Sequence, residues 1–495
     1  MTPSKYQEAV YDAFENTSEN INVSAVAGGG KTTLLLELLN RVPDDKTALL
    51  LAFNNSIVEE LRRKVKGREN VEIMTVHSYG WRAIMMKYGA RVRMNPNKTI
   101  AKTEMALKKL SVEELSSVKK GYYFYIIPKL IDLMRCNLTE PEEEDIKALA
   151  DYYGLDVGET EIKVAINVMR YMNHDKSQFD FTDMIYQPVV DPHIRFRKYD
   201  YILCDESQDF SRCQQELIRN TIGRKGRIVT VGDENQAIYS FAGADINSYK
   251  RLSEINGKSL SLPLSVCYRC AKSIVEEASH IVPQITAAPN AVEGKVDWGT
   301  LQDIGEGDWV LCRNLKPLVQ TYLWLIKNRI KSKIKGRDIG EGIIGMIDRT
   351  GASTLNGLMT LLDLEKGKMI KKLKKRGLKR PDLHPKIELF NQRQEVIEVL
   401  AEQVGTVRKL RELILNIFTD DVKGIMLSTI HKAKGLENER VFFICPELIP
   451  SKYATTEWEF ISERNLRYVA ITRAKSELIK VSTDTFNADI KTTIR

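Results

Sequence analysis

The glycine-rich loop at residues 25–32 is the sequence feature that most restricts the fold of this chain. It reads AVAGGGKT, follows a predicted short strand at residues 21–24 and precedes a leucine-rich segment with helical spacing at 32–40. Glycines let successive backbone N–H groups turn toward an anion, and a helix N-terminus adds positive potential. A simple turn before a helix is the alternative interpretation. The order strand, loop, helix favours a phosphate-binding loop, with Lys31 on the β and γ phosphates and Thr32 on magnesium.

Further apolar runs fit the buried strands of a parallel sheet. They cover residues 47–53, 201–204, 226–231, 308–313, 424–429 and 439–445, and helical patterns such as that at 54–66 lie between them. This alternation predicts an α/β fold with open parallel sheets. Ligands of such sheets lie beyond the carboxyl ends of the strands, where the glycine loop falls.

An acidic cluster, DESQD at residues 205–209, follows the apolar run at 201–204. Two adjacent carboxylates at a strand end can divide two tasks, because one can hold a magnesium ion while the other orients and deprotonates a water molecule. Such a cluster is also typical of a solvated loop. Its position downstream of a phosphate-binding loop favours the catalytic interpretation.

Other polar residues are candidates for the same chemistry. The segment GDENQ at 232–236 follows a predicted strand, and Gln236 can sense a γ-phosphate by hydrogen bonding. Arg269 and Arg473 are candidates for arginine fingers, which stabilise charge during phosphoryl transfer. Cys267 and Cys270 flank Arg269 as a CxxC pair, but no further ligands stand at a spacing that suits zinc.

Composition describes an ordinary globular chain with a basic balance. Its 495 residues are 43% hydrophobic and 28% charged, and the length suggests about three to four domains. The net charge of +8 is compatible with a polyanionic partner. No apolar run reaches the roughly 18 residues that span a bilayer. The polar N-terminus resembles no signal peptide, and seven scattered cysteines favour a reducing compartment. We therefore expect a cytoplasmic protein that is neither secreted nor membrane-bound.

Two segments interrupt the alternation of strands and helices. Residues 81–180 are rich in Lys, Glu, Leu and Tyr at helical spacing, and their acidic run at 141–145 is typical of a helix N-terminus. Residues 336–420 contain a basic stretch at 368–380. That stretch fits a helix with a solvated cationic face and fits contact with duplex DNA equally well, while a nuclear import signal is a third interpretation.

Five motifs in a fixed order resemble the superfamily 1 helicases of the UvrD/Rep/PcrA type. They are the phosphate loop, DESQD at 205–209, GDENQAIY at 232–239, HKAKGLE at 431–437 and YVAITRA at 468–474. A short echo, Thr75-x-His77 and Thr429-x-His431, ends two predicted strands and fits two similar lobes. The matching blocks run from Gln7 to Lys475, so the resemblance frames nearly the whole chain.

The resemblance implies roles for individual residues at a nucleotide site. Asp205 would ligate magnesium with Thr32, and Glu206 would be the general base. Gln236 would couple the γ-phosphate to DNA, and Arg269 and Arg473 would clamp that phosphate. Residues implied to contact the nucleotide are Gln7 on the adenine edge, Ala27, Gly28, Gly29, Gly30, Lys31, Thr32 and Thr33 in the loop, Tyr268 on the base and Glu437 on the ribose.

The resemblance also implies a track for single-stranded DNA and shows where this chain departs from the family. The track residues would be Phe53, Asn55, His77, Phe241, Thr429 and His431. Thr33 and Cys267 replace the family's usual Arg and Asn. Phe241-Ala242 replaces the Trp-Arg pair, which keeps a base-stacking ring and removes one DNA contact. The second insertion is short for the family.

The implied protein is an ATP- and Mg²⁺-dependent DNA helicase that moves 3′→5′ on single-stranded DNA. It would have two RecA-like lobes with ATP in the cleft, each carrying a mainly helical insertion. The expected boundaries are lobe 1A at 1–80 and 181–262, insertion 1B at 81–180, lobe 2A at 263–335 and 421–495, and insertion 2B at 336–420. Partners would be single-stranded DNA, junctions with duplex, and replication or repair proteins, for a protein functional as a monomer.

Two other functions stay open on the sequence alone. The small second insertion suits a translocase that strips proteins from DNA and unwinds poorly. A slow-turnover, ATP-dependent DNA-binding scaffold is the alternative from another class, and the presence of Glu206, Gln236, Arg269 and Arg473 argues against it.

Overall fold

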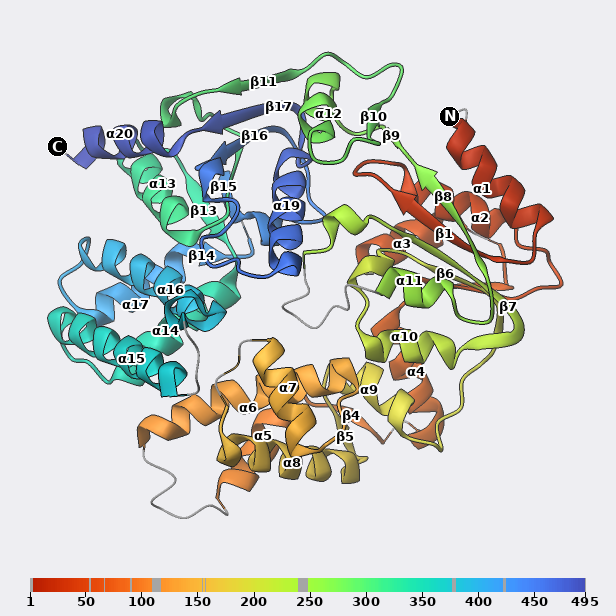
Figure 1. Cartoon of the computed structure of the whole chain (residues 1–495), viewed down its shortest axis with the longest axis horizontal. Coiled ribbons are helices and arrows are strands. Elements are labelled where there is room, and N and C mark those ends of the chain that lie inside the picture. Colours follow the sequence, from red (N-terminus) through yellow and green to blue (C-terminus); the bar gives the residue numbers. More distant parts are fainter. Residues whose placement is uncertain are drawn as a thin grey trace. The chain divides into compact units, whose positions relative to one another are not determined.

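The computed structural model describes residues 3–52, 55–65, 67–89, 91–108, 117–153, 155, 157–238, 248–375, 380–421 and 424–494. The chain divides into two compact units, Met1–Val266 and Cys267–Arg495. Each unit is built on its own parallel sheet and carries a group of additional helices (Figure 1). The predicted α/β class with parallel sheets in two lobes is confirmed.

The sheet of the first unit has six strands in the order β3-β2-β6-β7-β1-β8. Its strands are β1 (Asn20–Ala25), β2 (Ala48–Ala52), β3 (Val71–Thr75), β6 (Tyr199–Cys204), β7 (Ile222–Gly232) and β8 (Ser259–Leu264), and each neighbouring pair is parallel. All carboxyl ends therefore lie along one edge. Because β1, β7 and β6 are adjacent in the sheet, the loops that follow them are brought together.

Helices cover both faces of this sheet. Alternate residues of β2 point to opposite sides, so Leu49 and Leu51 join one hydrophobic core while Ala48 and Leu50 join another. A strand that is buried on both faces has apolar side chains on both, which explains the continuous apolar run in the sequence. The covering helices are α1 (Lys5–Asn16), α2 (Lys31–Asn40), α3 (Asn55–Lys64), α4 (Val76–Tyr88), α10 (Arg212–Arg219) and α11 (Ser248–Ser253).

Beyond the end of α4, the described residues of the helical segment predicted after residue 81 form four helices, which share a core with the sheet. They are α5 (Lys98–Leu107), α6 (Ser117–Asn137), α7 (Glu143–Tyr152) and α8 (Glu159–His174), followed by α9 (Asp183–Val190). The acidic run lies in the first turn of α7, as predicted. A short parallel pair, β4 (Arg93–Met94) and β5 (Gln178–Phe179), joins the beginning of the segment to its end. Buried residues of α6 and α8 belong to the same core as Leu49.

The sheet of the second unit has seven strands in the order β11-β17-β16-β12-β15-β13-β14. They are β11 (Lys295–Trp298), β12 (Trp309–Cys312), β13 (Ser332–Lys335), β14 (Phe418–Thr419), β15 (Ile425–Thr429), β16 (Asn438–Ile444) and β17 (Ala474–Val481), all parallel to their neighbours. A separate pair, β9 (Val266–Cys267) and β10 (Thr286–Ala287), precedes them. The helices beside this sheet are α12 (Lys272–Ser279), α13 (Leu315–Lys327), α18 (Ile430–Ala433), α19 (Glu457–Ile471) and α20 (Thr483–Ile494).

In the described part of the second unit's insertion there are four helices: α14 (Arg337–Thr350), α15 (Leu355–Lys375), α16 (Pro385–Ala401) and α17 (Val407–Ile417). The basic stretch lies on the last turns of α15, where Leu373 is buried and Lys371, Lys372 and Lys374 are exposed. Residues 376–379 of the stretch lie outside the described part of the chain. The residues before 375 thus form the predicted helix with an exposed cationic face, which fits a solvated face and a duplex-DNA contact equally.

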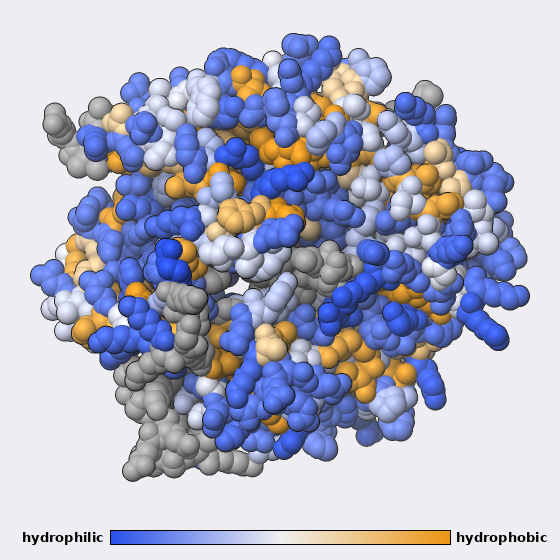
Figure 2. Space-filling view, viewed as in Figure 1, coloured by the Kyte–Doolittle hydropathy of each residue, from blue (hydrophilic) through white to orange (hydrophobic). Residues whose placement is uncertain are grey.

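Hydrophilic side chains predominate on the face shown in Figure 2, with apolar residues in scattered patches. Among the helices of the described ranges, none combines the length and the apolar character that a bilayer crossing requires.

Candidate active site

The glycine loop links β1 to α2 in a conformation that depends on its glycines. The Val26 N–H donates to the carbonyl of Leu264, and the Gly29 N–H donates back to the carbonyl of Val26 at 3.0 Å. Gly28 and Gly30 have φ values of 66° and 79°, in the left-handed region that glycine tolerates best. A Cβ atom on Gly29 would lie 2.9 Å from the Val26 carbonyl oxygen. The tight loop therefore leads directly into the N-terminus of α2, which Lys31 and Thr32 begin.

Lys31 meets the acidic residues that follow β6 and β7. Its Nζ lies 2.6 Å from Glu206 Oε1, and both side chains are largely buried. Burial lowers the pKa of Lys31, but the carboxylates of Glu206, Asp205 and Asp233 outweigh this effect and hold the pKa above its ordinary value. The predicted loop lysine and the predicted carboxylates therefore lie at one place on the sheet edge.

The carboxylates around Lys31 are hard to ionise. Burial and the adjacent charge of Glu206 raise the pKa of Asp205 to about 7, and burial raises the pKa of Asp233 to about 6. Two buried carboxylates of this kind favour a cation beside them. Glu206 itself has a φ of 49°, a strained conformation for a residue with a side chain. Strain of this kind tends to occur where a side chain must point in one direction.

The donor atoms at this place suit magnesium bound together with phosphate. Mg²⁺ takes oxygen ligands and commonly binds through one or two carboxylates, waters and substrate phosphates. Asp205 offers a buried carboxylate, and Thr32 offers a hydroxyl group from the first turn of α2. Nowhere in the described ranges do three His, Cys, Asp or Glu side chains gather as a metal-binding group. The residues present therefore fit an ion that is completed by phosphate and water.

Gln208 links the two strand ends and was given no role by the sequence. Its Nε2 donates to Glu206 Oε2 at 2.6 Å, and its Oε1 accepts from the Asp233 N–H at 3.1 Å. Gln236 Nε2 in turn donates to Asp233 Oδ2 at 2.7 Å. A Cβ atom on Gly232 would lie 2.4 Å from Gln208 Oε1, so the glycine makes room for the amide. Polar contacts thus run from Glu206 through Gln208 and Asp233 to Gln236.

Gln7 and Thr33 of the first unit are also implied to contact the nucleotide, but neither takes part in the polar contacts described around Lys31. Gln7 is buried on α1, and its Oε1 accepts from the Ser4 N–H at 3.0 Å in a capping box. This contact gives Gln7 a structural role beside the predicted one. Thr33 is exposed on α2.

Of the predicted residues of the second unit, Arg269 and Glu437 lie together. Arg269 forms an ion pair with Glu437, and Lys475 Nζ lies 3.3 Å from the same carboxylate. Tyr268 is 37% exposed. Arg473 is almost fully buried, and its guanidinium donates to the carbonyls of Val469 and Leu436.

The two Thr-x-His segments have the same local structure. Thr75 ends β3 and its hydroxyl oxygen accepts from the Ser78 N–H, while Thr429 ends β15 and accepts from the Lys432 N–H. Each threonine therefore caps the helix that carries the histidine. This confirms that both segments end strands, as the sequence predicts.

Burial keeps both histidines uncharged at neutral pH. It lowers the pKa of His77 to about 4, and burial together with Arg313 lowers the pKa of His431 to about 3. The ring of His77 stacks on Phe181 with centroids 4.1 Å apart. Phe181 is 62% exposed and was missed by the sequence analysis, although an aromatic residue between Asp180 and Asp183 could have drawn notice.

The remaining predicted DNA contacts are only partly within the described ranges. Asn55 begins α3 and is exposed. Phe53 and Phe241 lie outside the described residues. Arg313 was not predicted, and it pairs with Glu463 of α19 and with Glu388 of α16, each at 2.8 Å.

Both units match family models of helicase domains of the UvrD type. The family model of the UvrD/REP helicase N-terminal domain matches residues 6–255, and that of the UvrD-like helicase C-terminal domain matches residues 364–484. ATP-dependent DNA helicase PcrA of Bacillus subtilis is 26% identical over 290 residues, which make up 55% of this chain and 38% of that protein.

Two other relatives match along most of the chain. F-box DNA helicase protein 1 of Schizosaccharomyces pombe is 23% identical over 96% of this chain and 56% of that protein. A probable DNA helicase of Mycoplasma pneumoniae is 22% identical over 93% of this chain and 80% of that protein. The chain thus spans less than two thirds of the PcrA and F-box proteins. Among solved structures, Arterivirus nonstructural protein 10 (helicase) is 14% identical with a TM-score of 0.36, over 97% of this chain and 64% of that one.

Proposed function

Because the chain belongs to the UvrD/REP helicase family, we propose that it is an ATP-dependent DNA helicase that moves along single-stranded DNA. The observation that carries this proposal is the cluster at the sheet edge, in which Lys31, Asp205, Glu206 and Gln236 come from the ends of three adjacent strands. Only a few kinds of protein place a loop lysine, two adjacent carboxylates and a glutamine around one phosphate position, and motor ATPases are among them.

The proposed chemistry is in-line attack of water on the γ-phosphate. The loop N–H groups and Lys31 hold the β and γ phosphates. Mg²⁺, held by Thr32 and Asp205, would supply positive charge to the phosphate oxygens. Glu206 accepts a proton from the attacking water, for which its carboxylate must be released from Lys31. Phosphate provides that release, because it is the stronger partner for the ammonium group.

Coupling to DNA is proposed to begin at Gln236. The contacts from Glu206 through Gln208 and Asp233 mean that a change at the γ-phosphate reaches the end of β7 through hydrogen bonds. The chain continues from there toward Phe241, for which the family resemblance implies a base-stacking role. The nucleotide roles of Gln7, Tyr268, Arg269, Glu437 and Arg473 are likewise proposals drawn from the resemblance.

The proposed direction is 3′→5′, with single-strand–duplex junctions as substrate and magnesium as the working ion. Strand separation should be measured on duplexes with a 3′ or a 5′ single-stranded tail, with ATP and with a non-hydrolysable analogue. The proposal predicts unwinding of the 3′-tailed duplex with ATP only. Unwinding that starts solely from a 5′ tail would refute the direction.

A translocase that displaces bound proteins is the second candidate. The observation in its favour is the compact insertion of the second unit, which consists of α14 to α17. Release of streptavidin from biotinylated single strands, without unwinding of either tailed duplex, would select this function. A slow-turnover scaffold is the third candidate, and rapid ATP hydrolysis stimulated by DNA would exclude it.

A further inference from the structure

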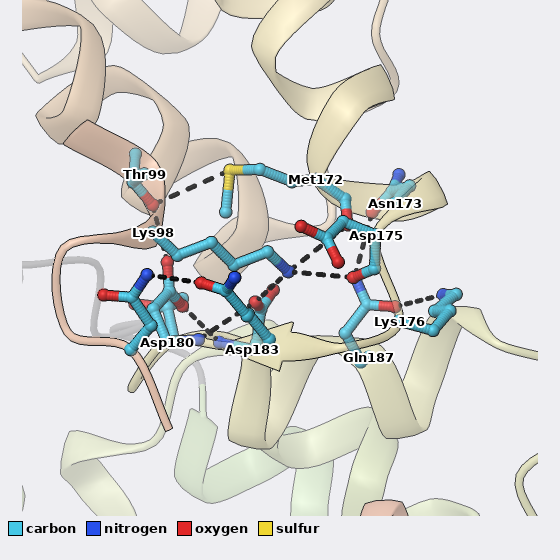
Figure 3. A network of polar contacts seen from close by, with 12 residues as sticks. Lys98, Thr99, Met172, Asn173, Asp175, Lys176, Asp180, Asp183 and Gln187 are labelled. Atoms are coloured by element: carbon cyan, nitrogen blue, oxygen red, sulfur yellow. Dashed lines mark hydrogen bonds and ion pairs between the residues drawn. The ribbon is translucent and has the colours of Figure 1, made fainter. Parts of the chain in front are cut away.

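A buried cluster of four charged side chains joins the helical segment of the first unit to the start of α9. Arg135 of α6 lies 2.8 Å from Asp180 and 3.1 Å from Asp183, and Lys98 of α5 lies 2.7 Å from Asp183. The four side chains are at most 7% exposed. Figure 3 shows Lys98 reaching across to Asp183, with Asp180 beside it. Two cations therefore face two buried carboxylates, and Arg135 also pairs with the half-exposed Asp132 at 2.5 Å.

The two aspartates also close the turn that they flank. Asp183 N–H donates to Asp180 Oδ1 at 2.8 Å, and Asp180 N–H donates to Asp183 Oδ2 at 3.1 Å. Thr99 adds a hydrogen bond from its hydroxyl group to Asp180 Oδ2. These reciprocal bonds fix the backbone of residues 180–183, and the cations fix the two carboxylates in turn. Phe181 is consequently held in one orientation.

A buried cluster of this kind fixes the positions of its side chains more than it adds to the free energy of unfolding. The free-energy cost of removing ions from water offsets most of the attraction between them. Apolar residues of similar volume would therefore stabilise a core equally well. Here the exposed ring of Phe181, which lies between the two aspartates in sequence, stacks flat against His77, with 20° between the ring planes. Helix α9, which begins at Asp183, packs closely on α4, which carries His77. A Cβ atom on Gly80 of α4 would lie 1.9 Å from the Met184 carbonyl oxygen.

We propose that Lys98, Arg135, Asp180 and Asp183 are positioning residues for the single-strand contact at His77. They hold Phe181 against the His77 ring and thereby couple helices α5 and α6 to the DNA-contacting edge of the sheet. This inference rests on the proposed function and on the resemblance to the helicase family, which implies that His77 contacts single-stranded DNA.

The test compares ATP hydrolysis without DNA and across a titration of oligo(dT). The variants are Asp180→Asn, which leaves Arg135 with one carboxylate fewer, and Phe181→Ala, which removes an exposed side chain and so preserves the fold. Asp175→Asn is the matched control, because it breaks the 2.7 Å Lys102–Asp175 ion pair of the same segment but keeps residues 180–183 and the Asp175 backbone carbonyl, which accepts from Lys98. Thermal unfolding is recorded for all three variants.

Asp180→Asn and Phe181→Ala should each raise the oligo(dT) concentration for half-maximal stimulation about 2- to 30-fold, the usual range of such couplings. The control should keep the wild-type value. Hydrolysis without DNA should stay near wild type, since none of these residues lies in the Lys31 cluster. If Asp180 acts through Phe181, the variant with both substitutions should need no more oligo(dT) for half-maximal stimulation than the more affected single variant.

Three results would overturn the inference, and they differ from one another. If oligo(dT) stimulates the wild type and Phe181→Ala has the same half-maximal concentration, the positioning role is wrong while the proposed function stands. If oligo(dT) fails to stimulate the wild type at all, the proposed function fails and the inference fails with it. An equal shift in Asp175→Asn would show that any loss of stability in the segment weakens DNA binding, and this too would overturn it.

Discussion

The Lys31 ammonium lies 2.6 Å from Glu206 Oε1, so the residue expected to hold phosphate is paired with the residue expected to activate water. Gln208 donates to the other oxygen of the same carboxylate. A phosphate that draws Lys31 away would leave Glu206 oriented by Gln208 and free to accept a proton. The pair therefore ties activation of the base to the arrival of the nucleotide.

Replacing Lys31 with alanine should abolish ATP hydrolysis. The loop would lose its phosphate-binding cation, and three carboxylates would lose their common partner. Steady-state hydrolysis at saturating Mg²⁺ and oligo(dT) is the measurement, with thermal unfolding as a check on folding. Lys46→Ala is a suitable control, because Lys46 lies in the exposed turn before β2. Activity near wild type in Lys31→Ala would refute the site assignment.

Glu206→Gln should separate binding from hydrolysis. Loss of the base should slow hydrolysis by roughly 10²- to 10⁴-fold, the usual contribution of general base catalysis. ATP affinity should be unchanged or higher, since Lys31 no longer has a carboxylate as a competing partner. Equilibrium binding of a fluorescent ATP analogue beside single-turnover hydrolysis checks both statements. Weaker nucleotide binding in Glu206→Gln would contradict the exchange of partners at Lys31.

The pKa of His77 gives a stability prediction with a definite sign. The pKa is about 4 in the folded protein and 6.5 in an ordinary setting, so between these values only the unfolded chain takes up the proton. The contribution of His77 to stability is complete above pH 6.5 and is lost as the pH falls toward 4. Unfolding temperatures of His77→Asn should therefore fall less than those of the wild type over this window. Parallel curves for the two proteins would contradict the lowered pKa of His77.

The exposed lysines on α15 allow a test of duplex binding. Changing Lys371, Lys372 and Lys374 to glutamine should weaken binding to a tailed duplex, because fewer DNA phosphates are neutralised. A plot of the logarithm of the association constant against the logarithm of the salt concentration should become shallower. Its negative slope should shrink in magnitude by up to about 0.9 for each phosphate left without a lysine. A matched triple variant at Lys108, Lys147 and Lys163, which are also exposed, controls for net charge. If both triple variants keep the wild-type slope, the basic stretch is only a solvated face.

Local patterns were sufficient to predict the phosphate loop and the strand ends. The glycine loop, the apolar runs and the Thr-x-His caps each depend on neighbours within a few residues, and the structure has all three as expected. The parallel sheets bring the loop and the carboxylates together because strands that are distant in sequence pair side by side. That juxtaposition follows from fold class alone.

Sequence patterns could not predict the polar contacts between residues that are far apart along the chain. Arg135 and Asp180 are 45 positions apart, and neither spacing nor charge indicated that they would pair in a core. The stacking of Phe181 on His77 depends on how α9 packs against α4, which periodicity does not give. The predicted lobe boundary at residue 180 falls between Asp180 and Asp183, which bind the same arginine.

The most direct test of the account is ATP hydrolysis by the intact chain in the presence of Mg²⁺, measured with and without oligo(dT). The account predicts hydrolysis that single-stranded DNA stimulates strongly in the wild type and that Glu206→Gln loses under both conditions. Hydrolysis that is absent, or that single-stranded DNA leaves unchanged, would contradict it.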